Sequence, residues 1–152
     1  MKISDALKGV RRLGVDTSPY IYYVENHRSY ADKMDAILQI VEANGLDINT
    51  SVIALTETLM KPLQATNQSL INAYRDLLIK TDYIHLIAVT SDLAEKAATL
   101  RAQYNLRTPD ALHIATAIVS HCEAFLTNDL GLKRVMEIRI LVLDELEIDP
   151  NL

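Results

Sequence analysis

The sequence has little cysteine, glycine and proline, and no tryptophan: one Cys, four Gly and four Pro in 152 residues. The single cysteine, Cys122, excludes a disulfide within the chain and a zinc site built from cysteines, and we expect it to be a buried, inert thiol. No apolar run approaches the ~18 residues of a membrane span, so we expect no membrane partner. The first sixteen residues lack the apolar core and cleavage site of a secretory signal. These absences favour the cytoplasm.

Several catalytic signatures are also missing. The chain has no glycine-rich phosphate loop, no Gly-x-Ser-x-Gly nucleophile elbow and no cysteine that looks activated. It has no internal repeat, low-complexity segment or Pro/Gly/Ser-rich linker, and its length is typical of one domain. The hydrophobic content of 49% indicates a folded globular chain, and the net charge of −5 argues against broad coating of nucleic acid.

Hydrophobic periodicity predicts strands that alternate with helices. Such alternation implies crossover connections, and it predicts a single α/β domain whose mainly parallel five-stranded sheet has helices on both faces. The expected strands are 13–15, 46–51, 83–89, 124–127 and 138–143. The expected helices are 20–26, 31–44, 52–63 with an interruption at Pro62, 69–80, 92–104 and 107–122, with one or two helical turns over 132–137.

The segment 107–122 organises the rest of the chain, because its helix is apolar nearly all round and must be buried. Thr108 is expected to cap its N-terminus, and Pro109 suits the first helical position. Asp110 then lies in the first turn. The helix dipole alone could explain an acid there, or Asp110 could face a polar site and bind a cation.

Three further acids lie where the expected sheet would bring them near Asp110. Asp16 and Asp129 each follow a strand, and Glu57 lies near the start of a helix. In a parallel sheet the carboxyl ends of the strands and the starts of the following helices share one edge. Crowded carboxylates need a proton or a cation, and Mg²⁺ or Mn²⁺ prefers carboxylate oxygen.

The segments 15–17, 54–57, 108–117 and 126–129 resemble, in order, the motifs of PIN domains, and the chain is most similar to VapC-type toxins. The resemblance implies one PIN-like domain over residues 1–152, with a core at about 13–143. It also implies a metal-dependent endoribonuclease, the toxin of a type II toxin–antitoxin system. The resemblance assigns catalytic and metal-binding roles to Asp16, Glu57, Asp110 and Asp129. Thr127 matches a polar position that supports the site in this family. A protein antitoxin, an RNA substrate and a homodimer are implied partners, with Tyr20–Tyr23 and the helices of 32–80 as candidate contact surfaces.

Several supporting residues carry two interpretations each. Thr17 could contact metal-bound water or phosphate, or merely start a helix. Arg107 could meet a phosphate or be a solvated loop charge. Asn128 could align Asp129, bond to the substrate backbone, or be structural. His113 could donate to an acid or to RNA, although a satisfied core histidine is the commoner case. Two functional alternatives also remain at this point: a catalytically silent PIN-like binding or regulatory module, and a PIN nuclease that acts in RNA maturation or on structured DNA.

Overall fold

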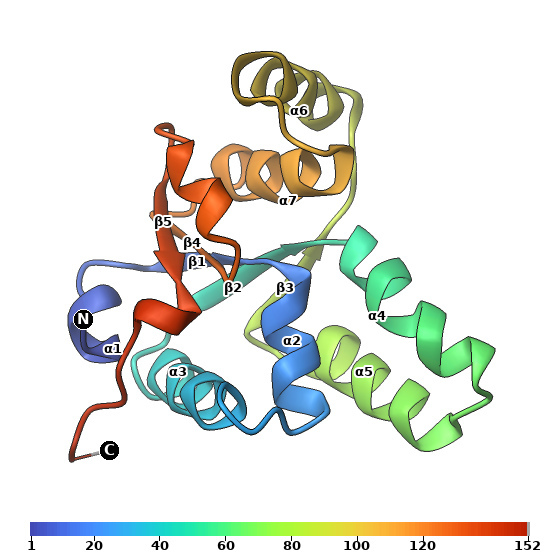
Figure 1. Ribbon diagram of the computed structural model, residues 1–152, viewed down its shortest axis with the longest axis vertical. Coiled ribbons are helices and arrows are strands. Elements are labelled where there is room, and N and C mark those ends of the chain that lie inside the picture. The colour runs from blue at the N-terminus through green and yellow to red at the C-terminus, as the bar shows by residue number, and fades with distance from the viewer. Residues whose placement is uncertain (152) are drawn as a thin grey trace.

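Five short strands form one parallel sheet in the order β3-β2-β1-β4-β5, in a computed structural model that describes residues 1–151 (Figure 1). The strands are β1 (Arg12–Val15), β2 (Asp47–Ser51), β3 (Ile84–Ile87), β4 (Ala124–Thr127) and β5 (Arg139–Val142). All four pairings are parallel. The predicted α/β class and the five-stranded parallel sheet are confirmed.

Helices cover both faces of this sheet (Figure 1). On one side α7 lies against β1 and β2, and α6 packs on α7; on the other side are α2, α3 and α5, with α4 packed against α5. The helices are α1 (Ile3–Ala6), α2 (Thr17–Val24), α3 (Ala31–Ala43), α4 (Ile53–Gln64), α5 (Gln68–Lys80), α6 (Ser91–Tyr104) and α7 (Thr108–Val119), and short 3-10 turns are η1 (Leu130–Arg134) and η2 (Leu143–Glu145). No helix within residues 1–151 is long and apolar enough to cross a bilayer.

The period of two along the strands divides the core into two layers. In β1, Leu13 and Val15 belong to the layer beneath α1 and α3, whereas Gly14 faces α7. A Cβ on Gly14 would lie 2.5 Å from the Cβ of Ala117 and 3.0 Å from Cδ2 of Phe125. Glycine therefore lets α7, with Asp110 at its start, approach the central strand closely.

The sheet register brings two parts of the predicted site together. Val15 is aligned with Leu126, and the amide of Asp16 donates to the carbonyl of Leu126 at 2.9 Å. The residues just after β1 and at the end of β4 are consequently neighbours, although more than 100 positions separate them in the sequence. Asp16 also begins α2, where its Oδ1 accepts a hydrogen bond from the amide of Thr17 at 2.8 Å.

Local details differ from the sequence prediction. Pro62 does not interrupt α4, which continues to Gln64: the proline lies in the last turn, where its missing amide removes a single intrahelical bond, and its ring is buried. The cap of α7 is Arg107 rather than Thr108, and no side chain completes it. The predicted turns over 132–137 are η1, which begins two residues earlier.

Two expectations about side-chain burial also need revision. Cys122 is half-buried rather than buried, and desolvation raises the pKa of its thiol, in keeping with an inert cysteine. In the stretch Tyr20–Tyr23, Tyr20 is fully buried and cannot reach a partner, whereas Tyr22 and Tyr23 are partly buried and pack against the core.

Candidate active site

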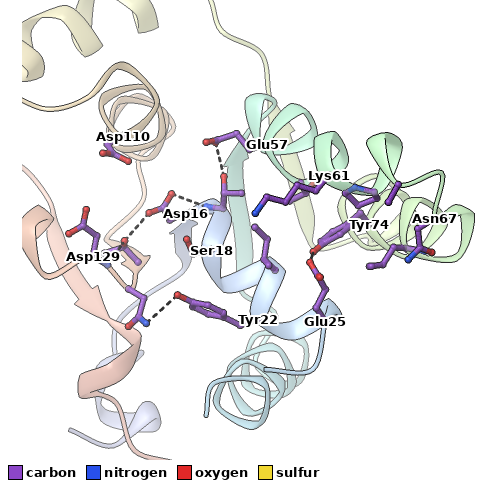
Figure 2. Close-up of a pocket in the computed structure, with 18 of the residues that line it drawn as sticks. Asp16, Ser18, Tyr22, Glu25, Glu57, Lys61, Asn67, Tyr74, Asp110 and Asp129 are labelled. Carbon is purple, nitrogen blue, oxygen red and sulfur yellow. Dashed lines mark hydrogen bonds between the residues drawn. The ribbon is translucent and has the colours of Figure 1, made fainter. Parts of the chain in front are cut away.

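The four acids singled out by the sequence line one open cavity of about 910 Å³ at the carboxyl edge of the sheet (Figure 2). Asp16 follows β1, Asp129 follows β4, Asp110 lies in the first turn of α7, and Glu57 lies on α4. Thr17, Arg107, Thr127 and Asn128 line the same cavity. The fold thus brings every residue of the predicted site to one cavity.

Thr127 links two of the acids through its hydroxyl group. The hydroxyl donates to Oδ2 of Asp16 at 2.8 Å and accepts from the amide of Asp129 at 3.1 Å. Burial raises the pKa of Asp16, and the negative charge of Asp110 adds to the rise. The hydrogen bonds from Thr127 and from the amide of Thr17 oppose it. Asp16 is therefore a desolvated carboxylate held at a defined orientation.

Glu57 is held by two side chains from other elements. Its Oε1 accepts a hydrogen bond from the Thr17 hydroxyl at 2.8 Å and lies 2.6 Å from Nε2 of His113. The hydrogen bond to His113 lowers the pKa of Glu57. His113 Nδ1 is buried without a partner among the described residues, which favours the tautomer with the proton on Nε2, where the acceptors lie. His113 joins α7 to α4 across the cavity wall.

Asp110 is paired with the neighbouring arginine. Arg107 Nε lies 3.0 Å from Oδ2 of Asp110 and Arg107 Nη2 lies 3.3 Å from Oδ1, so the contact is bidentate. Asp110 is buried, whereas the Arg107 side chain is 78% exposed. Arg107 is thus an exposed counter-cation to a buried acid rather than an unpaired loop charge.

Asn128 and Asp129 follow the end of β4; Asn128 is half-buried and Asp129 is exposed. The Asp129 Oδ1 atom accepts from the amide of Gly131 at 2.8 Å and so begins η1. Asn128 accepts from the amide of Asp144 at 2.9 Å and donates to the hydroxyl of Tyr22 at 3.4 Å. Both polar ends of the Asn128 amide are engaged, which favours its structural interpretation.

The acids are spaced more widely than the ligands of a bound metal ion. Within residues 1–151, no group of three or more His, Cys, Asp and Glu side chains stands close enough to hold an ion. The donor chemistry nevertheless suits a hard divalent cation, since the acids supply only carboxylate oxygens. Arg107 contacts both oxygens of Asp110, and Nε2 of His113 lies 3.9 Å from Oδ1 of the buried Asp16.

Sequence reasoning undervalued two residues of this cavity. His113 was expected to be a core histidine; it is buried, yet its ring nitrogen contacts Glu57 and Thr17. Lys61 was not considered, although it follows Glu57 by four residues and so shares its helix face, and it lines the cavity. That spacing was the available signal, but only the packing of α4 shows that this face borders the acids.

A family model for the PIN domain matches residues 14–138. Because this match covers most of the chain, the protein belongs to the PIN domain family. Among curated protein sequences, none matches the chain.

The fold is similar to that of solved toxin proteins. VapBC2 from Rickettsia felis, solved bound to a DNA fragment from its promoter, matches with a TM-score of 0.68 and 18% identity, over 86% of this chain and 98% of the other. A toxin–antitoxin complex from Klebsiella pneumoniae matches with a TM-score of 0.65 and 22% identity, over 87% of this chain and 97% of the other. A third match is VapC20 from Mycobacterium tuberculosis, a toxin that cleaves the sarcin–ricin loop. Its TM-score is 0.62 and its identity 16%, over 84% of this chain and 98% of the other.

Proposed function

We propose that the protein is a metal-dependent endoribonuclease that hydrolyses RNA phosphodiester bonds, and the toxin of a type II toxin–antitoxin pair. The observation that carries the proposal is the meeting of Asp16, Glu57, Asp110 and Asp129 in one cavity of a PIN domain. The similarity to toxin structures supports the choice of RNA, since one of those toxins cleaves an RNA loop.

The proposed ion is Mg²⁺ or Mn²⁺, held by Asp16, Asp110 and Asp129, with Glu57 as a further ligand or as the group that orients water. When bound, such an ion lowers the pKa of a coordinated water and offsets charge on the phosphate. The chain itself contributes the orientation of the acids. The amide of Thr17 donates to one oxygen of Asp16 and the hydroxyl of Thr127 donates to the other. The side chains of His113 and Thr17 both contact Oε1 of Glu57.

Arg107 has a second role in this proposal. A cation that binds Asp110 competes with the guanidinium of Arg107, whose side chain is 78% exposed. An arginine released at the rim of the site is well suited to a phosphate oxygen of the substrate. We therefore assign Arg107 to substrate binding once the acids are filled.

The direct test is cleavage of a panel of RNAs and DNAs with Mg²⁺, Mn²⁺ or EDTA. We expect RNA to be cut with either metal and to survive in EDTA. Asp16→Asn and Asp110→Asn should each abolish cutting while the far-ultraviolet circular dichroism stays that of the parent. The control is Asp5→Asn. Asp5 is an exposed acid on α1, which precedes β1, whereas Asp16 follows that strand.

Each contrary outcome points to a specific alternative. If no nucleic acid is cut in a chelator-sensitive way, the protein is a PIN-like binding or regulatory module. If structured DNA is cut and RNA is not, the substrate assignment is wrong. Unchanged cutting by either Asp→Asn variant would refute the assignment of these acids.

The partners form a separate part of the proposal. We infer that a protein antitoxin, encoded by a short adjacent gene, blocks the cavity, and that the toxin is a homodimer. Exposed apolar side chains on α4 and α5, namely Met60, Leu63 and Ile79, support a partner surface there. Light scattering at micromolar concentrations should give twice the mass of one chain, 17.0 kDa. A strictly monomeric mass would count against the dimer, and cleavage unaffected by the co-expressed neighbour would count against the antitoxin.

A further inference from the structure

We propose that the far part of the cavity, between α2, α4 and α5, binds the ribonucleotide next to the bond that is cut, with Lys61 as the contact to its phosphate. This inference rests on the proposed function. Figure 2 shows the acids at one end of the cavity, Tyr74 and Asn67 at the other end, and Lys61 between them. We call the part lined by Lys61, Asn67 and Tyr74 the distal lobe.

The size of the cavity indicates that it takes more than a phosphate. Its volume of about 910 Å³ lies within the range of pockets that enclose whole small molecules. A phosphate group with its ions occupies only the end where the acids lie. The distal lobe therefore has room for a sugar and a base that continue from the bound phosphate.

The charges of the cavity place a second phosphate near Lys61. Five acidic and two basic side chains line the cavity, which leaves a formal charge of −3. One of the bases, Arg107, is already paired with Asp110. None of the ion pairs in the described part of the chain involves Lys61, so its ammonium group is available to a polyanion. Lysine commonly binds phosphate through the point charge of its ammonium group.

The chemistry of the distal lobe suits a sugar and a base better than another phosphate. At its end the Tyr74 hydroxyl donates to Oε2 of Glu25, and the negative charge of Glu25 repels phosphate. Asn67 uses its oxygen to cap α5, which leaves its NH₂ group as a donor. Carboxylate acceptors and amide donors pair with ribose hydroxyls and base edges, the features by which proteins recognise unpaired RNA. Apolar side chains of Ile21 and Leu70 complete the wall.

The charge in this proposal is tested by the salt dependence of RNA binding. Fluorescence anisotropy with a short single-stranded RNA is measured in EDTA, which separates binding from cutting, for the parent, Lys61→Gln, Lys61→Arg and Lys8→Gln. Loss of one phosphate contact should make the slope of log K against log[salt] shallower by about 0.7, and weaken binding about eightfold at 50 mM salt and about threefold at 200 mM. Lys61→Arg should keep the parent's slope.

Lys8→Gln is the matched control, because Lys8 is an exposed lysine that precedes β1, at the other end of the strands from the acids. It should bind RNA as the parent does. Equal slopes for Lys61→Gln and the parent would overturn the phosphate contact, and so would an equal change in the Lys8→Gln variant.

The volume of the distal lobe is tested by filling it. Ala65 lines the lobe at the exposed end of α4, so Ala65→Trp can add bulk there without entering the core. We expect Ala65→Trp to weaken RNA binding severalfold at every salt concentration without changing the slope, and to keep the parent's melting temperature. Undiminished binding by this variant would overturn occupation of the lobe. DNA bound as tightly as RNA would refute the choice of a ribonucleotide.

Failure of this inference is distinguishable from failure of the proposed function. If the parent cuts RNA but Lys61→Gln binds it with the parent's slope and Ala65→Trp binds it undiminished, the nuclease stands and the distal lobe is not a subsite. If the parent cuts nothing while Lys61→Gln and Ala65→Trp both lose affinity, the chain binds RNA at this place without hydrolysing it.

Discussion

The guanidinium group of Arg107 spans both carboxylate oxygens of Asp110, three residues further along the chain, at 3.0 and 3.3 Å. The buried acid and its exposed partner form an internal ion pair at the start of α7. Any divalent cation that uses Asp110 competes with this pair.

Arg107→Gln should therefore bind metal more tightly than the parent while it cuts RNA more slowly. Removal of the guanidinium frees Asp110 and lowers the positive charge beside the acids, so the Kd for Mn²⁺ should fall severalfold. Electron paramagnetic resonance of free Mn²⁺ measures this affinity without substrate. A Kd equal to that of the parent would mean that the pair does not oppose metal binding. Arg101→Gln, on neighbouring α6, is the control for a general charge effect.

Asp16→Asn should stabilise the protein at neutral pH in EDTA. Burial raises the pKa of Asp16, so between its ordinary and its raised pKa the native state keeps a proton that the unfolded chain has released. The free energy of unfolding therefore falls as the pH rises through this window. Asparagine removes the buried charge and still caps α2, with an expected gain of about 1 kcal/mol. Urea unfolding at about pH 4 and pH 7.5 should show the gain shrink at the lower pH; a variant less stable than the parent at neutral pH would contradict the argument.

Thr127→Val should destabilise the protein and weaken metal binding together. The hydroxyl donates to Asp16 and accepts from the amide of Asp129, and valine can do neither. An unpaired buried acceptor costs about 1–3 kcal/mol, and the pKa of Asp16 should rise further because one of the bonds that lowers it is gone. Thr127→Ser restores the hydroxyl and should behave as the parent in both urea unfolding and Mn²⁺ titration. Equal stability of the valine and serine variants would show that the bonds contribute nothing.

Gly14→Ala should destabilise the fold by about 1–3 kcal/mol, because the new methyl group would lie 2.5 Å from the Cβ of Ala117. Thermal unfolding measures the loss. The double variant Gly14→Ala with Ala117→Gly removes the clashing methyl group and should be more stable than the sum of the two single changes predicts. Strict additivity in this cycle would show that the close approach of β1 and α7 is not what requires glycine.

The sheet, and the location of the four acids at one edge of it, could be predicted from short-range patterns. Short apolar runs at Leu13–Val15 and Ala124–Thr127 mark the strands, and an acid within two residues of a strand's end must lie at the carboxyl edge. The pairing of Arg107 with Asp110 was harder to foresee, since an exposed loop position allows many side-chain directions. The apolar pattern of α7 placed His113 in the core, whereas its contact with Glu57 depends on how α4 packs against α2. Lys61 was missed for the same reason.

The strand order has a consequence for the timing of synthesis. The central strand β1 is made early, but its neighbour β4, which brings Thr127 and Asp129 beside Asp16, comes more than 100 residues later. A nascent chain that has emerged only as far as α7 therefore carries three of the acids without the fourth, and without the hydroxyl that orients the first. A ribosome making this protein must finish most of the polypeptide before the cavity with its full set of acids can exist.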